Sequence, residues 1–222
     1  MISNWLYRVP TIVKWCYPSW YIWDKKTPEK KTIYLTFDDG PIPEVTEFVL
    51  DTLSRKRTNP IPATFFCIGD NVRKHPDVFK KIIASGHAIG NHTYNHLKGN
   101  ITPTKEYIEN IQLAQLEIGK HINTISNTYI TTLFRPPYGR IKRKQAKRLK
   151  RQGYDIIMYR VIGYDWDSTI TPEQCLKNIT QKTKSGDIIV LHDSPKAFKN
   201  MQYALPRAID YFLDEGFEFK KL

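Results

Sequence analysis

From residue 32 onward, short apolar runs alternate with amphipathic stretches along the chain. The run at 33–37 is rich in β-branched and aromatic residues, which predicts a buried strand. Further strands are expected at 63–68, 86–90, 131–134, 154–161 and 187–191, and the chain ends on a Phe-Glu-Phe run at 217–219. Most of these runs are continuously apolar, which indicates parallel strands that are covered on both faces.

The stretches between these runs have helical periodicity. The longest helix is expected to begin near Thr104, because apolar residues then recur at steps of three and four to form one stripe, namely Tyr107, Ile111, Ala114, Ile118 and Ile122. Other helices are expected at 45–53, 72–84, 140–151, from 172 and around 203–213. About seven such units predict an α/β fold, a closed or nearly closed TIM-barrel-like (β/α) barrel of parallel strands.

The length of 222 residues suits one domain with a substantial core. We expect residues 32–222 to form this domain. Residues 1–31 contain three prolines and are predicted to form an N-terminal extension that packs on the outside of the barrel. Its tryptophans stand among basic residues, so it either covers the barrel, which we favour, or contacts a membrane surface.

The chain carries a net charge of +12, which favours a polyanionic neighbour such as an acidic cell-wall polymer. Eight of the twelve residues at 140–151 are basic. This pattern predicts a helix that turns Ala146 and Leu149 inward and exposes its charged face to solvent. No nucleic-acid partner is expected, because no base-stacking aromatic residues are interleaved with these charges.

Neither a disulfide framework nor a membrane span is expected. The three cysteines are odd in number and lack paired spacing, and no apolar stretch approaches the roughly 20 residues that cross a bilayer. The first 23 residues lack the apolar core and cleavage site of a secretory signal. These features favour the cytoplasm or a place at the membrane periphery.

Polar residues follow five of the predicted strands. Active sites of parallel barrels lie where strands end and loops begin, so we expect these residues to share one face. They are Asp38-Asp39-Gly40, the segment 91–96, the segment 135–139, Asp165-Trp166 and His192-Asp193.

His92 and His96 are four residues apart and would project side by side from one turn of a helix. Such a pair is weak evidence for a metal site by itself, but Asp39 from another strand end supplies a third ligand. Two imidazoles and one carboxylate leave positions open for water and substrate, as in catalytic zinc sites. The same set also suits non-haem iron, although iron oxygenases usually take a histidine and the carboxylate from one local motif.

The adjacent carboxylates of Asp38 and Asp39 each need a cation or hydrogen-bond donors after a buried strand. We expect a metal to satisfy Asp39 and Arg135 to satisfy Asp38. Asp38 then stays free to act as a general base, and coordination lowers the pKa of a water to about 7, so a modest base suffices.

His192 has no metal-like partner in its own loop, which favours the role of general acid towards a leaving amine. A carboxylate beside it would raise its pKa and orient the ring. Asp165 is the expected partner, and Asp193 is the second candidate.

In order and spacing, these motifs resemble the polysaccharide deacetylase family, the NodB-like members of carbohydrate esterase family 4. The resemblance covers roughly residues 31–222 and rests on five motifs: TFDDGP at 36–41, HTYNH at 92–96, RPPYG at 135–139, Asp165-Trp166, and LHD at 191–193. The segment 161–164 departs from the family pattern, which often has a further acidic residue there.

The resemblance implies a distorted (β/α) barrel that removes N-acetyl groups from sugars. It assigns the base to Asp38, a divalent metal to Asp39, His92 and His96, and the acid to His192 with Asp165. Zinc is the usual metal, with cobalt or nickel as alternatives. Arg135 would brace Asp38, the Tyr138 amide would bind the oxyanion, and Trp166 and Leu191 would line the acetyl pocket.

Three functions are weighed on these residues. The favoured one is hydrolysis of the N-acetyl amide of N-acetylglucosamine units in peptidoglycan, chitin-like oligomers or a lipid-linked glycan. The second is hydrolysis of other carbon–nitrogen bonds, as in small cyclic amides. The third is an inactive glycan-binding module, which the intact set of motif residues argues against.

Overall fold

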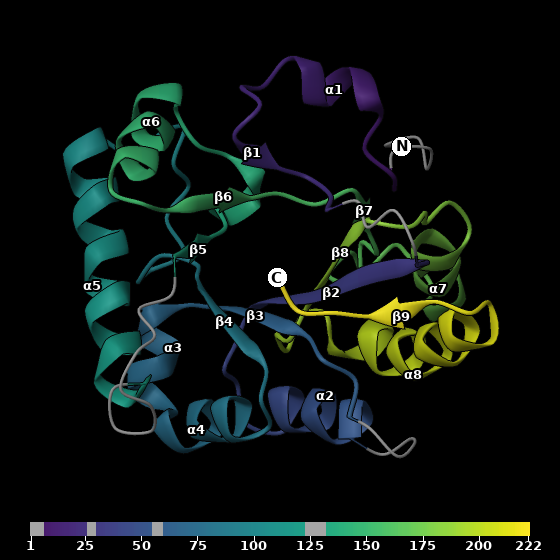
Figure 1. Cartoon of the computed structure of the whole chain (residues 1–222). Coiled ribbons are helices and arrows are strands. Elements are labelled where there is room, and N and C mark those ends of the chain that lie inside the picture. Colours follow the sequence, from purple (N-terminus) through teal and green to yellow (C-terminus); the bar gives the residue numbers. More distant parts are fainter. Residues whose placement is uncertain (1–6, 26–29, 55–59, 123–131) are drawn as a thin grey trace.

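The computed structural model describes residues 7–25, 30–54, 60–122 and 132–222. Its centre is a sheet of parallel strands in the order β1-β6-β5-β4-β3-β2-β8-β7, with β9 paired to β2 (Figure 1). The strands are β1 (Tyr21–Ile22), β2 (Thr32–Asp39), β3 (Thr64–Cys67), β4 (Ala88–Asn91), β5 (Leu133–Phe134), β6 (Asp155–Ile157), β7 (Val161–Ile162), β8 (Ile188–His192) and β9 (Glu218–Phe219).

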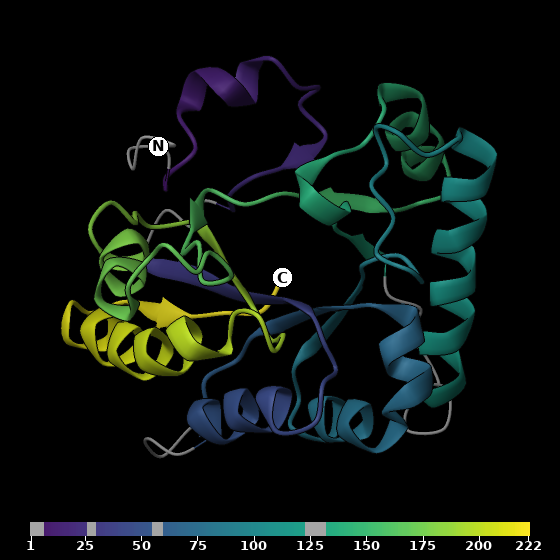
Figure 2. The same cartoon turned by 180° about the vertical axis from the view of Figure 1, so that it is seen from behind.

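Helices surround this sheet on several sides (Figures 1 and 2). They are α1 (Thr11–Trp15), α2 (Val45–Ser54), α3 (Gly69–Lys74), α4 (Pro76–Ala84), α5 (Thr104–Ile122), α6 (Arg143–Arg151), α7 (Pro172–Thr180) and α8 (Phe198–Asp214), with the 3₁₀ turn η1 (Pro137–Gly139). The curled parallel sheet with its surrounding helices confirms the predicted distorted (β/α) barrel. Among the described residues, no helix combines the length and apolar character needed to cross a bilayer.

Two predicted elements are divided in the structure. The helix expected at 72–84 breaks at His75, because Pro76 has no N–H to continue the first helix and instead occupies the first turn of α4. The strand expected at 154–161 splits into β6, which pairs with β1 and β5, and β7, which pairs with β8. The pattern of apolar residues does not indicate this change of neighbouring strand. Residue 131 of another expected strand lies outside the described residues.

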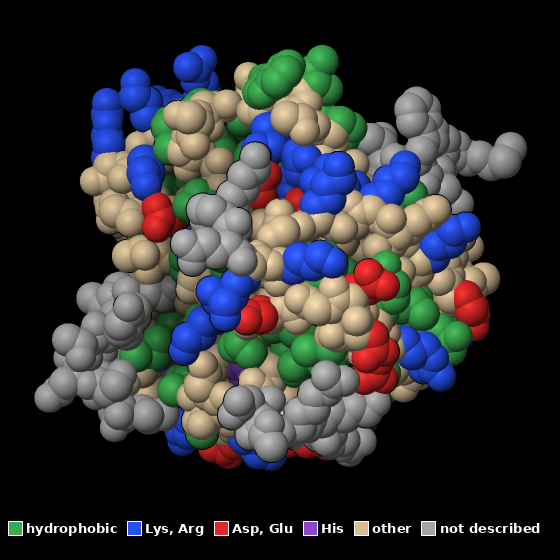
Figure 3. Space-filling view, turned by 45° about the vertical axis from the view of Figure 1, so that its right-hand side comes forward, with side chains coloured by type: hydrophobic (Ala, Val, Ile, Leu, Met, Phe, Trp, Pro, Cys, Tyr) green, Lys and Arg blue, Asp and Glu red, His purple; other side chains and the backbone are tan. Residues whose placement is uncertain are grey.

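The basic segment forms α6, which begins at Arg143, three residues later than predicted. Its buried residues are Gln145, Ala146 and Leu149, and its six Lys and Arg side chains are all exposed. Lys and Arg side chains gather at the upper left of the molecule in the space-filling view (Figure 3). The amphipathic pattern therefore fixes which face of this helix packs and which meets solvent.

The segment before β2 is more closely integrated than an external cover. Residues 21–22 join the sheet as β1, and the Tyr7 carbonyl accepts a hydrogen bond from Ile162 of β7. Arg8 forms a two-bond ion pair with Asp187, at 2.9 and 3.0 Å. This segment therefore contacts both β6 and β7, the two strands into which the expected 154–161 strand divides. Trp23 is buried, whereas Trp15 is exposed and Trp5 lies outside the described residues.

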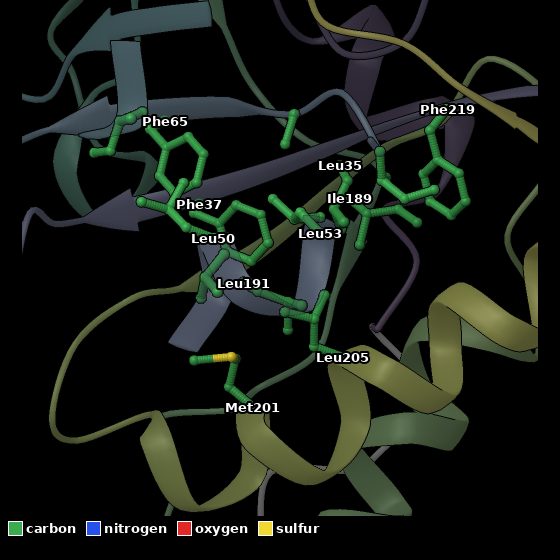
Figure 4. Packing of buried hydrophobic residues seen from close by; sticks show 14 of the residues in the cluster. Leu35, Phe37, Leu50, Leu53, Phe65, Ile189, Leu191, Met201, Leu205 and Phe219 are labelled. Carbon is green, nitrogen blue, oxygen red and sulfur yellow. The ribbon is translucent and has the colours of Figure 1, made fainter. Parts of the chain in front are cut away.

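The largest apolar cluster lies between the sheet and helices α2 to α5, α7 and α8. Leu35 and Phe37 of β2 meet Ile189 and Leu191 of β8 in this cluster, and Met201 and Leu205 of α8 close it from the other side (Figure 4). This packing holds the two central strands in register, with Asp38 opposite His192.

A buried carboxylate fixes the turn that follows β2. Asp193 accepts hydrogen bonds from the Gly40 amide at 2.9 Å and from the Thr46 hydroxyl at 2.6 Å. A side chain at Gly40 would place its Cβ 1.9 Å from Asp193 Oδ2, so only glycine permits this approach.

We predict that Gly40→Ala lowers the free energy of unfolding by about 1–3 kcal/mol, because the new methyl group must displace Asp193. Urea denaturation checks this value. Gly119→Ala is the matched control, since its Cβ meets nothing within 4 Å near the C-terminal end of α5. That variant should gain about 0.5–1 kcal/mol, and equal effects of the two substitutions would contradict the steric account.

Candidate active site

The loops that follow the strands enclose a pocket of about 660 Å³. Asp38 and Asp39 end β2, His92 and His96 follow β4, and His192 ends β8. All five line this pocket, together with Tyr138 and Trp166. The structure thus brings together at one face the side chains that the sequence places at separate strand ends.

Asp39, His92 and His96 form a compact ligand set. Asp39 Oδ1 lies 3.3 Å from His96 Nε2 and 3.8 Å from His92 Nε2, and one ligand atom from each residue fits within 4.8 Å of the others. Asp39 Oδ1 is buried and has no hydrogen-bond partner among the described residues. A buried carboxylate oxygen without a donor is costly, and a divalent cation between the three groups would satisfy it.

The tautomer of His92 supports the same interpretation. Its Nδ1 lies 2.8 Å from the Arg135 carbonyl oxygen, which can only accept a hydrogen bond. The proton is therefore on Nδ1, and Nε2 keeps its lone pair towards Asp39 and His96. Burial lowers the pKa of His92 to about 4, assisted by the charge of His96, so the ring is neutral as a metal ligand must be.

The two histidines do not lie on a helix, contrary to our expectation. Residues 92–96 form a loop in which Thr93 has φ 64° and His96 has φ 55°, and the imidazole centroids are 5.1 Å apart. Asn110 of α5 holds the loop by accepting hydrogen bonds from the amides of Tyr94 and Asn95, at 2.8 and 3.0 Å. The side chain of Asn110 therefore takes the place of the hydrogen bonds of a helical turn. The four-residue spacing of the two histidines does not indicate this contact.

Asp38 lies beside this set and is bound by Arg135. Arg135 Nη1 donates to Asp38 Oδ1 at 2.7 Å, while Asp38 Oδ2 lies 3.9 Å from His92 Nε2. Burial by itself would raise the pKa of Asp38, but the charge of Arg135, with smaller contributions from His92 and His192, outweighs burial and lowers it. Asp38 is therefore an ionised carboxylate with one oxygen directed towards the metal position.

His192 lies on a neighbouring strand and is bound to Asp165. Its Nδ1 lies 2.9 Å from Asp165 Oδ1, and its amide donates to Asp165 Oδ2 at 2.6 Å. Burial opposes protonation of His192, but the Asp165 carboxylate, assisted by Asp39 and Asp38, raises its pKa to about 9. Asp193, the second candidate partner, points elsewhere and binds Gly40 and Thr46.

The apolar wall differs in part from the prediction. Trp166 lines the pocket, with its ring 4.6 Å from that of His192. Leu191 does not: it is fully buried in the core between the sheet and α8 (Figure 4), because successive strand residues face opposite sides. Val190, with the same parity as His192, lines the pocket in its place.

Sequence reasoning missed three other residues of this wall. Tyr159, Ile162 and Tyr164 all line the pocket, and the last two come from the segment 161–164 that departs from the family pattern. The replacement of Leu191 by Val190 could have been predicted, because alternate residues of a strand face the same side and His192 faces the pocket. For Tyr159 no comparable signal exists, because it lies at the break between β6 and β7.

Backbone strain is concentrated around the pocket. Six non-glycine residues of the described chain have positive φ, and five of them lie in these loops. They are Asp39, Thr93, His96, Tyr138 and Tyr164. Such conformations cost about 1–3 kcal/mol each and persist where the surroundings impose them, which is typical of functional sites.

The chain belongs to the polysaccharide deacetylase family, whose model matches residues 25–157. Two relatives from Bacillus cereus carry the name peptidoglycan-N-acetylglucosamine deacetylase. One is 31% identical over 204 residues, which is 91% of each chain. The other is 34% identical over 166 residues, or 75% of this chain, and here the match spans only 57% of the relative's length.

The same likeness holds in three dimensions. A crystal structure of the Bc1960 peptidoglycan N-acetylglucosamine deacetylase, in complex with an N-oxidanyl-benzamide, superposes with a TM-score of 0.83 at 29% identity. The superposition covers 96% of this chain and 95% of that one. The N-terminal segment and the loops around the pocket therefore belong to a fold shared along almost the whole chain.

We predict that Asp39→Ala reduces bound zinc several-fold, because the cation loses its only carboxylate among the three grouped ligands. Mass spectrometry of the metal content after dialysis measures the loss. Asp38→Asn is the control at the neighbouring position, because its amide oxygen can still accept the hydrogen bond of Arg135, and this variant should keep its zinc. Equal loss from both variants would contradict the division between the two aspartates.

We also predict that Asp165→Asn lowers the pKa of His192 from about 9, because burial then acts without the opposing carboxylate. NMR titration of the imidazole in the metal-loaded protein measures the change. Asp167→Asn removes the same charge from a partly exposed position nearby and should leave this pKa close to its original value. A pKa unchanged by Asp165→Asn would exclude Asp165 as its cause.

Proposed function

We propose that this protein hydrolyses the N-acetyl amide of N-acetylglucosamine residues in a glycan, with zinc as its metal. The observation that carries the proposal is that Asp38 and His192, register partners on neighbouring strands, both line one pocket beside the ligand set Asp39, His92 and His96. A base and an acid with pKa values shifted in opposite directions suit a reaction that takes one proton from water and gives one to an amine.

Asp39, His92 and His96 would hold the divalent cation, which supplies Lewis-acid activation of water and of the acetyl carbonyl. Asp38 Oδ2 accepts the proton of the attacking water, while Arg135 fixes the other carboxylate oxygen. His192, held by Asp165, then donates a proton to the nitrogen of the leaving amine. This division uses each of the two adjacent aspartates for one task.

The wall of the pocket suits an acetyl group. Trp166, Val190 and Ile162 present apolar surface that excludes water around a small methyl group. Tyr138, whose ring lies 4.6 Å from that of His96, has φ 59°, a conformation that sets the direction of its backbone amide. We assign this amide to stabilisation of the oxyanion, a contribution of about 2.7–4 kcal/mol where such donors have been removed in other enzymes.

Contact with an anionic cell wall or membrane surface belongs to the same proposal. The exposed charges of α6 and the net charge of +12 support a polyanionic environment for the substrate. The fold is also compatible with the two alternatives, a hydrolase of small cyclic amides and an inactive glycan-binding module. Acetate release separates the favoured function from both.

We predict that Asp38→Asn reduces kcat by at least about 10²-fold while zinc stays bound, because the amide cannot accept the proton of the attacking water. Acetate release from an N-acetylglucosamine oligomer and metal analysis of the same sample measure both effects. Full activity in this variant would remove Asp38 from the role of base.

We further expect a strong chelator to stop acetate release and added zinc to restore it, since the ligand set would be emptied and refilled. The assay should cover peptidoglycan fragments, chitin-type oligomers and a small cyclic amide. Activity confined to the cyclic amide would overturn the glycan assignment. Activity that is indifferent to the chelator would remove the metal from the mechanism.

A further inference from the structure

A second pocket of about 430 Å³ lies outside the proposed catalytic machinery. One side comes from the N-terminal segment, and the other from residues 141 and 143 at the start of α6. Its lining consists of Trp15, Cys16, Tyr17, Pro18, Tyr21, Ile141 and Arg143. Aromatic rings and a guanidinium group therefore face one space.

The two pockets are neighbours along the chain. Gly139 lines the active-site pocket, whereas Ile141 and Arg143 line the second one. Because an extended chain advances at most about 3.6 Å per residue, the Cα atoms of residues 139 and 141 are within roughly 7 Å of each other. A chain-like substrate bound in the first pocket can therefore reach the second within a few of its units.

The aromatic side of the second pocket is exposed but firmly supported. Trp15 is 78% exposed and lies on α1, which buries none of its residues. Beside it, the Tyr17 ring packs edge-on against Tyr21 and Trp23, with centroid distances of 5.2 Å in both cases. Exposed hydrophobic side chains at the top of the molecule are visible in Figure 3. A large exposed indole next to a rigid aromatic floor is typical of a binding surface.

Arg143 provides the polar side. It is exposed, and no ion pair is found for it within the described ranges. The preceding Arg140, between the two pockets, is also exposed. A free guanidinium presents a planar set of donors that suits hydroxyl and carboxylate oxygens. The combination of apolar ring faces and convergent donors matches a sugar ring, which has apolar C–H faces and polar edges.

We propose that this second pocket is a distal subsite for a sugar residue of the glycan chain whose N-acetyl group lies in the active site. The inference rests on the proposed function for the identity of the chain. Trp15 stacks on the sugar ring, Arg143 donates hydrogen bonds to its oxygens, and the N-terminal segment thereby contributes to substrate binding. The enzyme consequently prefers long oligomers to short ones.

The test compares a dimer and a hexamer of N-acetylglucosamine as substrates. Trp15→Ala and Arg143→Gln should each lower kcat/KM for the hexamer by roughly threefold to tenfold and leave kcat/KM for the dimer unchanged. Both side chains are exposed, so the fold should be retained, and the unfolding temperature checks this. Equal effects on the two substrates, or no effect on either, would overturn the subsite.

Matched controls use the same elements. Trp15→Phe keeps an aromatic face and should retain most of the preference for the hexamer. Lys147→Gln removes an equal charge from an exposed position of α6 that does not line the pocket, and should leave both substrates unaffected. A loss with Lys147→Gln as large as that with Arg143→Gln would assign the effect to overall charge and overturn the subsite.

Calorimetric titration of the hexamer separates this inference from the proposed function. If the wild-type protein releases no acetate from either oligomer, the proposed function fails. Even then, the subsite predicts that Trp15→Ala weakens hexamer binding by roughly threefold to tenfold. An unchanged Kd, or no binding of the hexamer to the wild-type protein, would reject the subsite.

Discussion

The buried guanidinium of Arg135 is the interaction on which the rest of the site depends. It is 1% exposed and donates to Asp38 Oδ1, to the Thr36 hydroxyl and to the Met158 carbonyl, while its own carbonyl faces His92 Nδ1. One residue thereby connects β2, the residue that follows β6 and the loop after β4. Removing one partner of such a buried pair typically costs about 3–5 kcal/mol, because the other charge is left uncompensated. The ionisation of Asp38 follows from the guanidinium, and the tautomer of His92 follows from the carbonyl of the same residue.

The two aspartates that end β2 have different environments although they are adjacent. Asp38 is bound by Arg135, whereas Asp39 adopts φ 88° and directs an unpaired oxygen at two imidazoles. Asp193 holds the following turn through Gly40, and Asn71 donates to the Asp39 carbonyl at 2.7 Å. The neighbouring loops therefore impose a strained backbone that presents Asp39 to the metal position, while Arg135 binds one oxygen of Asp38.

Much of this arrangement was accessible from the sequence, and the failures have identifiable causes. Continuous apolar runs predicted the parallel barrel, and polar residues at the strand ends predicted which side chains would meet. The loop conformation of His92 and His96 was missed, because it depends on Asn110, a residue of another element. Leu191 was placed in the pocket from its motif, although strand alternation directs it into the core. The strand β1 and the break at Tyr159 involve pairing with the N-terminal segment, which no local pattern encodes.

A crystal structure of the zinc-loaded protein tests the central claim most directly, because that claim assigns the two adjacent aspartates to different tasks. The account predicts a single zinc ion bound by Asp39 Oδ1 and by the Nε2 atoms of His92 and His96, at about 2.0–2.2 Å. Asp38 should remain outside the coordination sphere and keep its hydrogen bond to Arg135. Zinc coordinated by Asp38, or located away from these three residues, would contradict the account.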